Sequence, residues 1–307
     1  MFFHQGKLDM VLTTQAYASM SNAQELVPIE KRYEDVKLSA EYVESRVKYP
    51  KFVFETILDY VEKSLGTFPK YPLAVDIGCG PGLMSTVFLA PYFDKVLGVD
   101  ISESQIEQAT LNNKHSNIEY SLSVAEKLPV EENSVTLIQV ATALHWLNYE
   151  KFYRECDRVL VPGGVIAAFS YTVKDILIVN HPRSLAIQDV LMRISNKLAS
   201  FDINPYYSER NEWAARRYTY PRLQIPYEDT KRVDGQYMEF PSTISGILRC
   251  LMTTAYIRLF VNNSEENQLW WKDCHQRLME AYGTDDPEAP LTFKLEVFML
   301  LGRKPTL

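Results

Sequence analysis

Residues 73–82, which read LAVDIGCGPG, constrain the fold of this chain more than any other stretch. The run LAVDI is apolar except for one acid, is too short for a helix and stops at a cluster of glycines. This is the pattern of a buried parallel strand that enters a tight turn. The glycines lack a Cβ atom, so the backbone can take positive φ angles and a ligand can approach it closely. Because Pro81 suits a first helical position, we expect a strand, a glycine turn and a helix over residues 81–89, with a nucleotide-type site at the end of the strand.

A second apolar run, VLGVDI at residues 96–101, predicts the next strand and contains an acid near its end. This acid, Asp100, lies 18 positions beyond Gly82, where a carboxylate can accept hydrogen bonds from a ribose diol. Two ligand classes share this arrangement. A dinucleotide fingerprint, G-x-G-x-x-G/A, needs a small residue where this chain has Leu83, and Pro81 lacks an N–H that a pyrophosphate could use. The sequence therefore disfavours a nicotinamide dinucleotide.

The pattern D-x-G-x-G-x-G, from Asp76 to Gly82, resembles the first motif of the class I S-adenosylmethionine-dependent methyltransferases, and Asp100 matches their ribose-binding acid. The resemblance implies an α/β, three-layer Rossmann-like fold whose seven-stranded sheet is mostly parallel with an antiparallel last strand. It also implies S-adenosyl-L-methionine as cofactor and S-adenosyl-L-homocysteine as product. This ligand is zwitterionic and carries no phosphate, so the acid Asp76 is compatible with it but would repel a pyrophosphate. A glycine triplet alone also occurs in ordinary strand–helix turns; the two acids in register favour the cofactor site.

The same resemblance assigns the contacts around the adenosine. The SESQ stretch after Ile101 is a capping box that opens a helix, and its main chain would form one wall of the pocket. The segment SVAEKLP at residues 123–129 resembles the family segment that holds the adenine. Val124 stands where many members have an acid or a serine, so we expect backbone groups of Val124 and Ala125, and packing on the ring, in place of a side-chain hydrogen bond. The expected cofactor contacts are Arg46, Asp76, Gly78, Cys79, Gly80, Asp100, Ile101, Gln105, Val124, Ala125 and Ala141.

The methyl acceptor is expected beside the end of the fourth strand, residues 135–141, where the chain continues as A-x-H-W at residues 143–146. This pattern resembles small-molecule enzymes similar to trans-aconitate methyltransferase, and it differs from the N/D-P-P-Y/F pattern of nucleic acid amino-methyltransferases. We expect His145 to be the catalytic side chain nearest the reacting centre. It can act as a general base, donate an orienting hydrogen bond or be a structural histidine. Trp146 can border a cationic substrate through its π face or fill the core.

A Y…R…YP pattern precedes the first strand and resembles the segment that closes over cofactor and substrate in the same group. By that resemblance Tyr42, Arg46 and Tyr49 cover the site, and an arginine there could pair a carboxylate bidentately. The alternative is a surface arginine beside packed tyrosines. Tyr256 is expected on a substrate wall, so the expected substrate contacts are Tyr42, Tyr49, Trp146 and Tyr256.

Four parts are predicted along the chain. They are a mobile N-terminal tail (1–29), a cofactor-binding core (30–170), an inserted cap that binds substrate (171–260), and a C-terminal helix and final strand that complete the sheet (261–307). Within the cap, residues 184–198 have helical apolar spacing and a serine cap. Residues 201–237 are rich in tyrosine, proline and arginine without periodicity, which predicts an irregular lid.

Composition limits the partners and the compartment. The 307 residues carry a net charge of −7 and no block of Lys or Arg, so a nucleic acid partner is not expected. No apolar run approaches the ~20 residues of a membrane helix, so a membrane partner is not expected either. The four cysteines lie far apart without zinc spacing, which predicts reduced thiols in a cytoplasmic protein and no metal. The sequence makes no prediction of the oligomeric state.

These features predict a methyltransferase that acts on a small molecule. The favoured reaction is O-methylation of a small carboxylate by in-line transfer, because the cap is rich in arginine and the net charge is acidic. An amine, phenol or carbon acceptor is the first alternative, because tyrosines also suit uncharged or cationic substrates. A protein that binds the cofactor without turnover is the second.

Overall fold

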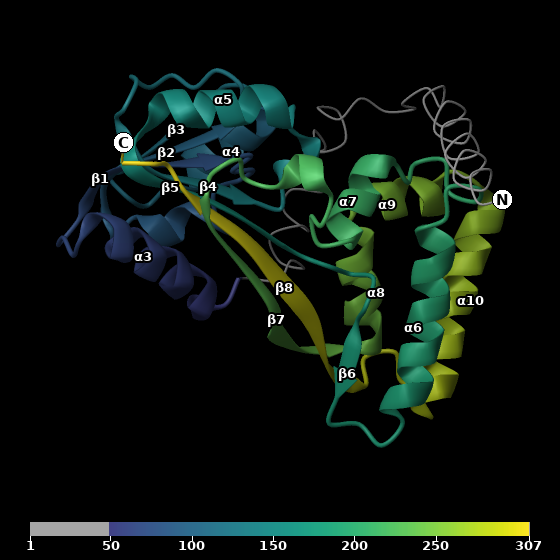
Figure 1. Cartoon of the computed structure of the whole chain (residues 1–307). Helices are drawn as coiled ribbons and strands as arrows, with labels where there is room; N and C mark the ends of the chain where they lie inside the picture. Colours follow the sequence, from purple (N-terminus) through teal and green to yellow (C-terminus); the bar gives the residue numbers. More distant parts are fainter. Residues whose placement is uncertain (1–48, 307) are drawn as a thin grey trace, which may run out of the picture.

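The computed structural model of this protein describes residues 49–306 and is built around one mixed sheet of eight strands (Figure 1). The strands are β1 (Tyr71–Ile77), β2 (Phe93–Asp100), β3 (Ile118–Leu122), β4 (Val135–Ala141), β5 (Leu160–Tyr171), β6 (Leu177–Val179), β7 (Asp229–Thr243) and β8 (Pro290–Arg303). Their order is β3-β2-β1-β4-β5-β8-β6, and β7 pairs along β8 at the other edge.

Strands β1 to β5 are parallel to one another, whereas β8 runs antiparallel to β5, β6 and β7. The prediction of a mostly parallel α/β sheet with an antiparallel last strand is confirmed. The predicted number of seven strands is wrong by one, because the three-residue strand β6 continues in the direction of β5 along the same edge of β8 and pairs with Thr292–Lys294. A strand of three residues is too short to show the alternation of apolar and polar residues by which a strand is recognised in a sequence.

The helices cover both faces of the sheet. The α-helices are α3 (Lys51–Leu65), α4 (Glu103–Asn112), α5 (Tyr149–Val159), α6 (Ser184–Leu198), α7 (Glu209–Ala215), α8 (Ile244–Met252), α9 (Ala255–Asn262) and α10 (Glu265–Tyr282), and the 3-10 helices are η2 (Thr86–Leu89), η3 (Leu144–Trp146) and η4 (Pro221–Leu223). Helices α3 and α5 lie on opposite faces (Figure 1). This arrangement gives the three layers that the sequence predicts.

Two apolar clusters, one on each face, form the core. Alternate residues of a strand point to opposite faces, so Ala74 and Leu137 pack with α3 whereas Val75 and Ile138 pack with α5. All four side chains are completely buried. A parallel strand covered on both faces reads as a continuous apolar run, which is why β1 and β4 could be located from sequence.

The helix predicted directly after the glycine turn is not formed. The chain makes an irregular turn and then only the single 3-10 turn of η2. Gly82 has a φ of 74°, and a Cβ atom there would lie 2.6 Å from the Tyr120 ring, so the backbone leaves the helical region at this residue. Ser85, with a φ of −139°, interrupts it again.

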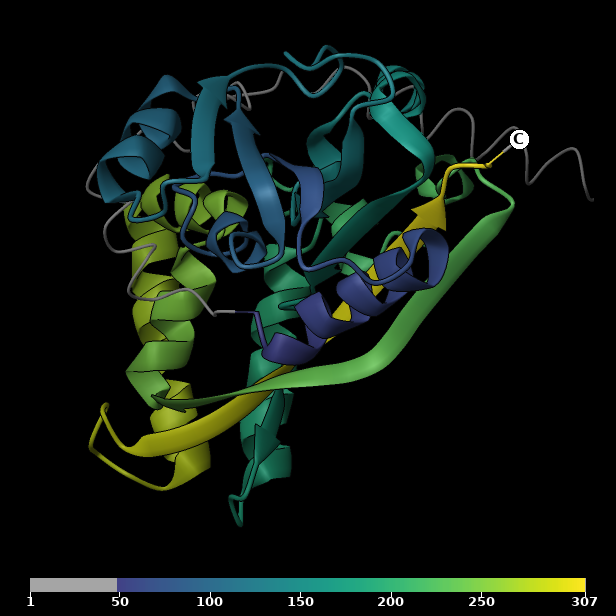
Figure 2. The ribbon, with the colours of Figure 1, turned by 90° about the vertical axis from the view of Figure 1, so that its left-hand side faces the viewer.

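The cap helices do not come from one continuous insertion. Helix α6 packs beside α10, which belongs to the C-terminal part of the chain (Figure 1). Between them in sequence lies β7, which pairs with β8 over nearly its whole length and forms a long two-stranded arm from the sheet toward the cap (Figure 2). The irregular structure predicted for residues 201–237 is therefore wrong in part. This range contains α7, opened by a capping box at Ser208, and the first half of β7.

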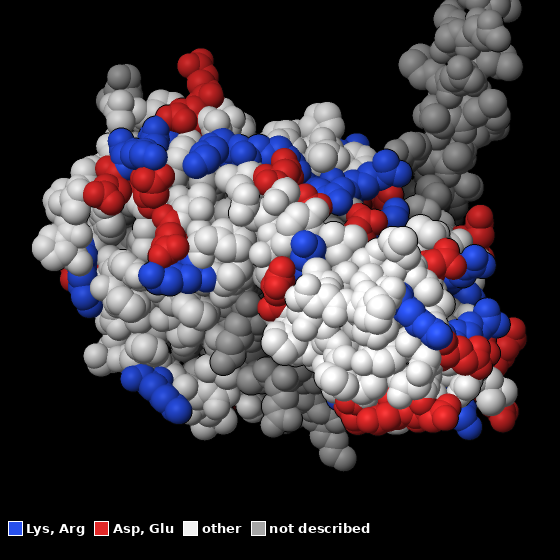
Figure 3. Space-filling view, turned by 90° about the horizontal axis from the view of Figure 1, so that it is seen from below, with Lys and Arg blue, Asp and Glu red and all other residues white. Residues whose placement is uncertain are grey.

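The surface carries both signs of charge. Acidic and basic side chains lie side by side on the face in Figure 3. Exposed ion pairs of the described residues include Arg249–Glu288. Among the described helices, none is both long and apolar enough to cross a membrane by itself, and α8 with α9 reaches that apolar content only as a pair bent by 98°.

Replacing Leu137 by alanine in the central strand β4 should lower the free energy of unfolding by about 2–5 kcal/mol, because a fully buried side chain leaves a cavity. The same change at Leu122, which is 55% exposed at the end of edge strand β3, should cost about 0.5 kcal/mol or less. Urea unfolding of the two variants measures both values. Equal losses would contradict the assignment of the core.

Candidate functional site

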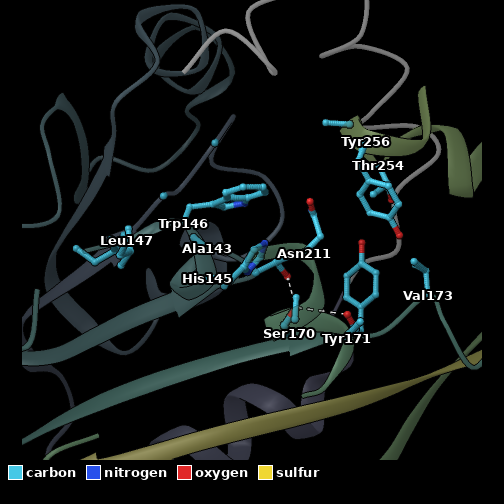
Figure 4. A pocket seen from close by; sticks show the side chains of 18 of the residues that line it. Ala143, His145, Trp146, Leu147, Ser170, Tyr171, Val173, Asn211, Thr254 and Tyr256 are labelled. Carbon is cyan, nitrogen blue, oxygen red and sulfur yellow. Dashed lines mark hydrogen bonds between the residues drawn. The ribbon is translucent and has the colours of Figure 1, made fainter. Parts of the chain in front are cut away.

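A cavity of about 370 Å³ opens at the carboxyl ends of the parallel strands, between the sheet and the cap. Its sheet side is formed by the glycine turn after β1, the end of β2 and the segment after β4. Its cap side is formed by residues of α6, α7 and α9 and by the segment after β5. Figure 4 shows His145 and Trp146 on one side of the cavity, and Tyr171 and Tyr256 on the other.

The glycine turn is shaped by close contacts and by Asp100. Gly78 has a φ of 63°, and a Cβ atom there would lie 2.7 Å from the Ala143 side chain, so only glycine fits. The backbone N–H of Gly80 donates to Asp100 Oδ2 at 2.9 Å. This bond joins the turn after β1 to the end of β2, so the two halves of the sequence motif meet as expected.

Asp100 presents a carboxylate to the cavity. Its Oδ1 accepts from the Ser102 backbone N–H at 2.9 Å. Burial raises the pKa of Asp100, while the backbone N–H groups of Ser102 and Gly80 oppose that rise. A carboxylate oxygen can accept two hydrogen bonds, so both oxygens retain capacity for the hydroxyls of a diol. The acid therefore fits the ribose position inferred from the sequence.

Asp76 is completely buried and does not line the cavity. Its Oδ2 accepts from the Ser85 and Thr86 hydroxyls at 2.8 and 2.6 Å, and its Oδ1 accepts from Gln139 Nε2 at 3.1 Å. Burial raises the pKa of Asp76 to about 6, against the three hydrogen bonds that lower it. This carboxylate therefore stabilises the glycine turn through buried hydrogen bonds and does not face the ligand cavity.

The other residues predicted to contact cofactor or substrate divide into three groups. Those that line the cavity are Gly78, Gly80, Ile101, Gln105, Ala125, Ala141, His145, Trp146 and Tyr256. Cys79 and Tyr49 instead line an adjoining space of about 50 Å³ that shares six lining residues with the cavity, and Val124 is 49% exposed and does not line the cavity. Tyr42 and Arg46 lie outside the described residues.

His145 is held in place from two directions by residues of the cap. It lies in η3, is buried, and its Nδ1 is 2.7 Å from the Tyr218 hydroxyl. The Arg210 guanidinium of α7 donates to the backbone carbonyls of His145 at 3.1 Å and Trp146 at 2.6 Å. The imidazole and the indole are 4.7 Å apart between ring centroids. The cap therefore fixes both the backbone and the ring of the predicted catalytic residue.

The acceptor side of the cavity is lined by hydroxyl, amide and aromatic groups and by Lys174, the single Lys or Arg lining it among the described residues. The arginines that the cap supplies are used elsewhere. Arg210 binds backbone carbonyls, Arg216 pairs with Glu212, and Arg217 pairs with Glu296. Within residues 49–306, no group of three or more His, Cys, Asp or Glu side chains is arranged to hold a metal.

Sequence reasoning missed five residues of this site. They are Thr142, Ser170, Lys174 and Asn211, which line the cavity, and Tyr218, which contacts His145. Thr142 and Ser170 stand at the carboxyl ends of β4 and β5, where ligand contacts are expected in an open parallel sheet, so their positions were a usable signal. The sequence around Asn211 and Tyr218 gave no signal, because only the tertiary packing of the cap brings these two residues to the site.

Comparison with known proteins assigns the central part of the chain to a family. Residues 75–168 match the model of a methyltransferase domain. A Dictyostelium discoideum protein named as a methyltransferase is 29% identical over 291 residues, which cover 91% of this chain and 98% of that protein. A Saccharomyces cerevisiae protein named as an S-adenosylmethionine-dependent methyltransferase is 30% identical over 144 residues, but these cover only 43% of this chain and 45% of the yeast protein.

A solved structure from Anaeromyxobacter dehalogenans, described as a type II methyltransferase, shares the fold. It aligns with a TM-score of 0.64 and 24% identity over 85% of this chain and 99% of that one.

The buried Asp76 predicts a pH dependence of stability. Its pKa is raised from 3.8 to about 6, so between these values the native protein binds more protons at this site than the unfolded chain. The free energy of unfolding should therefore fall as pH rises from about 3 to about 7, by about 3 kcal/mol in total from this group. Urea unfolding of the wild type and Asp76→Asn across this range measures the difference, which parallel curves would refute.

Proposed function

We propose that this chain is a class I S-adenosylmethionine-dependent methyltransferase that methylates a carboxylate oxygen of a small molecule. The methyltransferase assignment is supported by the matched domain and by the Dictyostelium discoideum relative, and the fold is supported by the solved structure. The similar proteins do not show that this chain belongs to the subgroup that resembles trans-aconitate methyltransferase. The acceptor is our inference from the chemistry of the cavity.

The sheet side of the cavity fits the cofactor. Asp100 offers two carboxylate oxygens for the ribose hydroxyls, and the turn at Gly78 has no side chain that would block a ligand. Ile101 and Ala125 supply apolar surface for an adenine. When bound, S-adenosylmethionine would supply a methyl group on its sulfonium. A carboxylate oxygen of the acceptor would form a bond to the methyl carbon as the bond from that carbon to sulfur breaks, which gives a methyl ester and S-adenosylhomocysteine with no proton to remove.

The single observation that carries the choice of acceptor is the charge of the cavity wall. Lys174 is the single Lys or Arg among the described lining residues. Its ammonium group forms no ion pair with a described carboxylate, although it lies close enough to Glu212 to lower the pKa of that acid. The two acidic lining residues, Asp100 and Glu126, are engaged with backbone N–H groups on the sheet side. An anionic acceptor would therefore meet a positive charge on the cap side and replace its lost hydration with a charge-assisted hydrogen bond.

One observation favours a different acceptor. Trp146, Tyr171 and Tyr256 present aromatic rings to the same space, which suits a cationic or aromatic substrate (Figure 4). Methylation of an amine or a phenol is therefore the second candidate.

Loss of the ribose-binding acid should weaken cofactor binding. Asp100→Asn keeps the size of the side chain but removes its charge and one acceptor oxygen, so affinity for S-adenosylhomocysteine should fall by about 1.5–3 kcal/mol. The matched control is Asp94→Asn, an exposed aspartate on the same strand β2. Calorimetric titration measures both, and unchanged affinity in Asp100→Asn would show that the ribose lies elsewhere.

The acceptor class is tested by transfer of a labelled methyl group from S-adenosylmethionine to a panel of mono-, di- and tricarboxylic acids, amines and phenols. We expect methyl esters as products. Lys174→Met should raise the KM of the acid about tenfold or more, whereas Lys174→Arg and the exposed control Lys70→Met should leave it nearly unchanged.

Two results would contradict the proposal. Transfer only to amines or phenols would reject the carboxylate and favour the second candidate. Calorimetric binding of the cofactor without transfer to any class in the panel would favour a protein that binds the cofactor without turnover.

A further inference from the structure

Two consecutive residues after α7, Arg217 and Tyr218, adopt the left-handed conformation with φ angles of 54° and 53°. Neither is a glycine, so each carries a steric cost that persists only when the surroundings enforce it. The surroundings do so here. Arg217 pairs with Glu296, the Tyr218 N–H donates to the Trp213 carbonyl at 2.9 Å, and Gln224 Nε2 donates to the Tyr218 carbonyl at 2.6 Å.

The strained backbone delivers one side chain to the site. The Tyr218 side chain is completely buried, its ring packs edge-on against Phe298 at 5.1 Å, and its hydroxyl is 2.7 Å from Nδ1 of His145. A fully buried phenol is an unusual partner for a histidine that lines a cavity. Strain of this kind clusters where a precise geometry is needed.

The direction of this hydrogen bond follows from where the phenol hydrogen can go. Burial raises the pKa of Tyr218, so the phenol keeps its hydrogen and needs an acceptor. Nδ1 of His145 is the acceptor at short distance. The other polar side chain beside the phenol is Ser170, and its hydrogen bond lowers the pKa of Tyr218, which is the effect of a donor to the phenol oxygen and not of an acceptor. If Nδ1 carried a hydrogen, the buried phenol would lose its short acceptor.

We infer that Tyr218 is a positioning residue that fixes His145 in the tautomer with its proton on Nε2. In that tautomer Nε2 can act on a bound acceptor only as a hydrogen-bond donor, because it already carries a hydrogen and cannot remove one from a substrate. The acceptor must then bring its own ionised oxygen. This inference rests on the proposed function and deepens it, since a carboxylate is ionised at neutral pH whereas an alcohol, a phenol or an ammonium group must lose a proton before it reacts.

The tautomer can be measured directly by nitrogen NMR of the imidazole, with the His145 signals assigned by comparison with His145→Gln. We expect a protonated Nε2 and an unprotonated Nδ1 in the wild-type protein. Tyr218→Phe should give a mixture of tautomers, whereas Ser170→Ala should leave the wild-type pattern. A hydrogen on Nδ1 of the wild-type protein, alone or together with one on Nε2, would overturn the inference.

A matched control separates positioning from stability. Tyr153 is also buried in the same apolar cluster, and its hydroxyl donates to the Leu223 carbonyl at 2.7 Å, so Tyr153→Phe loses a comparable bond without touching His145. Both variants should lose similar stability, but only Tyr218→Phe should change the tautomer and lower kcat, by about tenfold. An equal effect of both variants on kcat would reduce Tyr218 to a structural residue.

The NMR result does not depend on turnover, so it separates this inference from the proposed function. An Nε2–H tautomer in a protein that methylates only amines would reject the carboxylate and keep the role of Tyr218. A carboxylate methyltransferase with Nδ1 protonated would reject the role of Tyr218 and keep the function.

Discussion

The buried carboxylate of Asp76 is the constraint on which the site depends. It accepts hydrogen bonds from Ser85, Thr86 and Gln139, and thereby joins the end of β1, the segment after the glycine turn and the neighbouring strand β4. A carboxylate without water is costly to bury, and its raised pKa measures that cost. In return the glycine turn is fixed in a position where the Gly80 N–H can donate a hydrogen bond to Asp100 at the end of β2.

The position of the cap depends on the position of the strand ends, because the cap is hydrogen-bonded to the segment after β4. Arg210 binds the backbone carbonyls of η3, and Tyr218 binds the ring of His145, so one short stretch of the cap holds the same residue twice. Movement of α7 would therefore displace the histidine. Three of the arginines that suggest an anion-binding cap in the sequence, Arg210, Arg216 and Arg217, are occupied by these contacts and by ion pairs. Lys174 is the single Lys or Arg among the described residues that line the cavity.

The sheet and the cofactor side were predictable from sequence because their signals are local. Strand β4 has exactly the predicted bounds, and β1 and β2 differ from the prediction by a few residues, because strands buried on both faces read as apolar runs. Strand β7 was missed because most of its side chains are exposed and many are charged, as befits an edge strand that resists pairing with other molecules. The acceptor side depends on contacts such as Tyr218 to His145, 73 positions apart, which no local pattern encodes.

The distribution of charge in the cavity bears on product release as well as on binding. In the proposed reaction, methyl transfer removes the positive charge of the sulfonium and the negative charge of the acceptor at the same time. The attraction between Lys174 and the carboxylate, which is strengthened by the partly enclosed site, then disappears, and a neutral ester remains beside an ammonium group that water solvates better. In the proposed reaction, the one cation and the neutral hydroxyls among the described residues of the acceptor side would bind the ionised substrate more strongly than its product, which favours turnover over product inhibition.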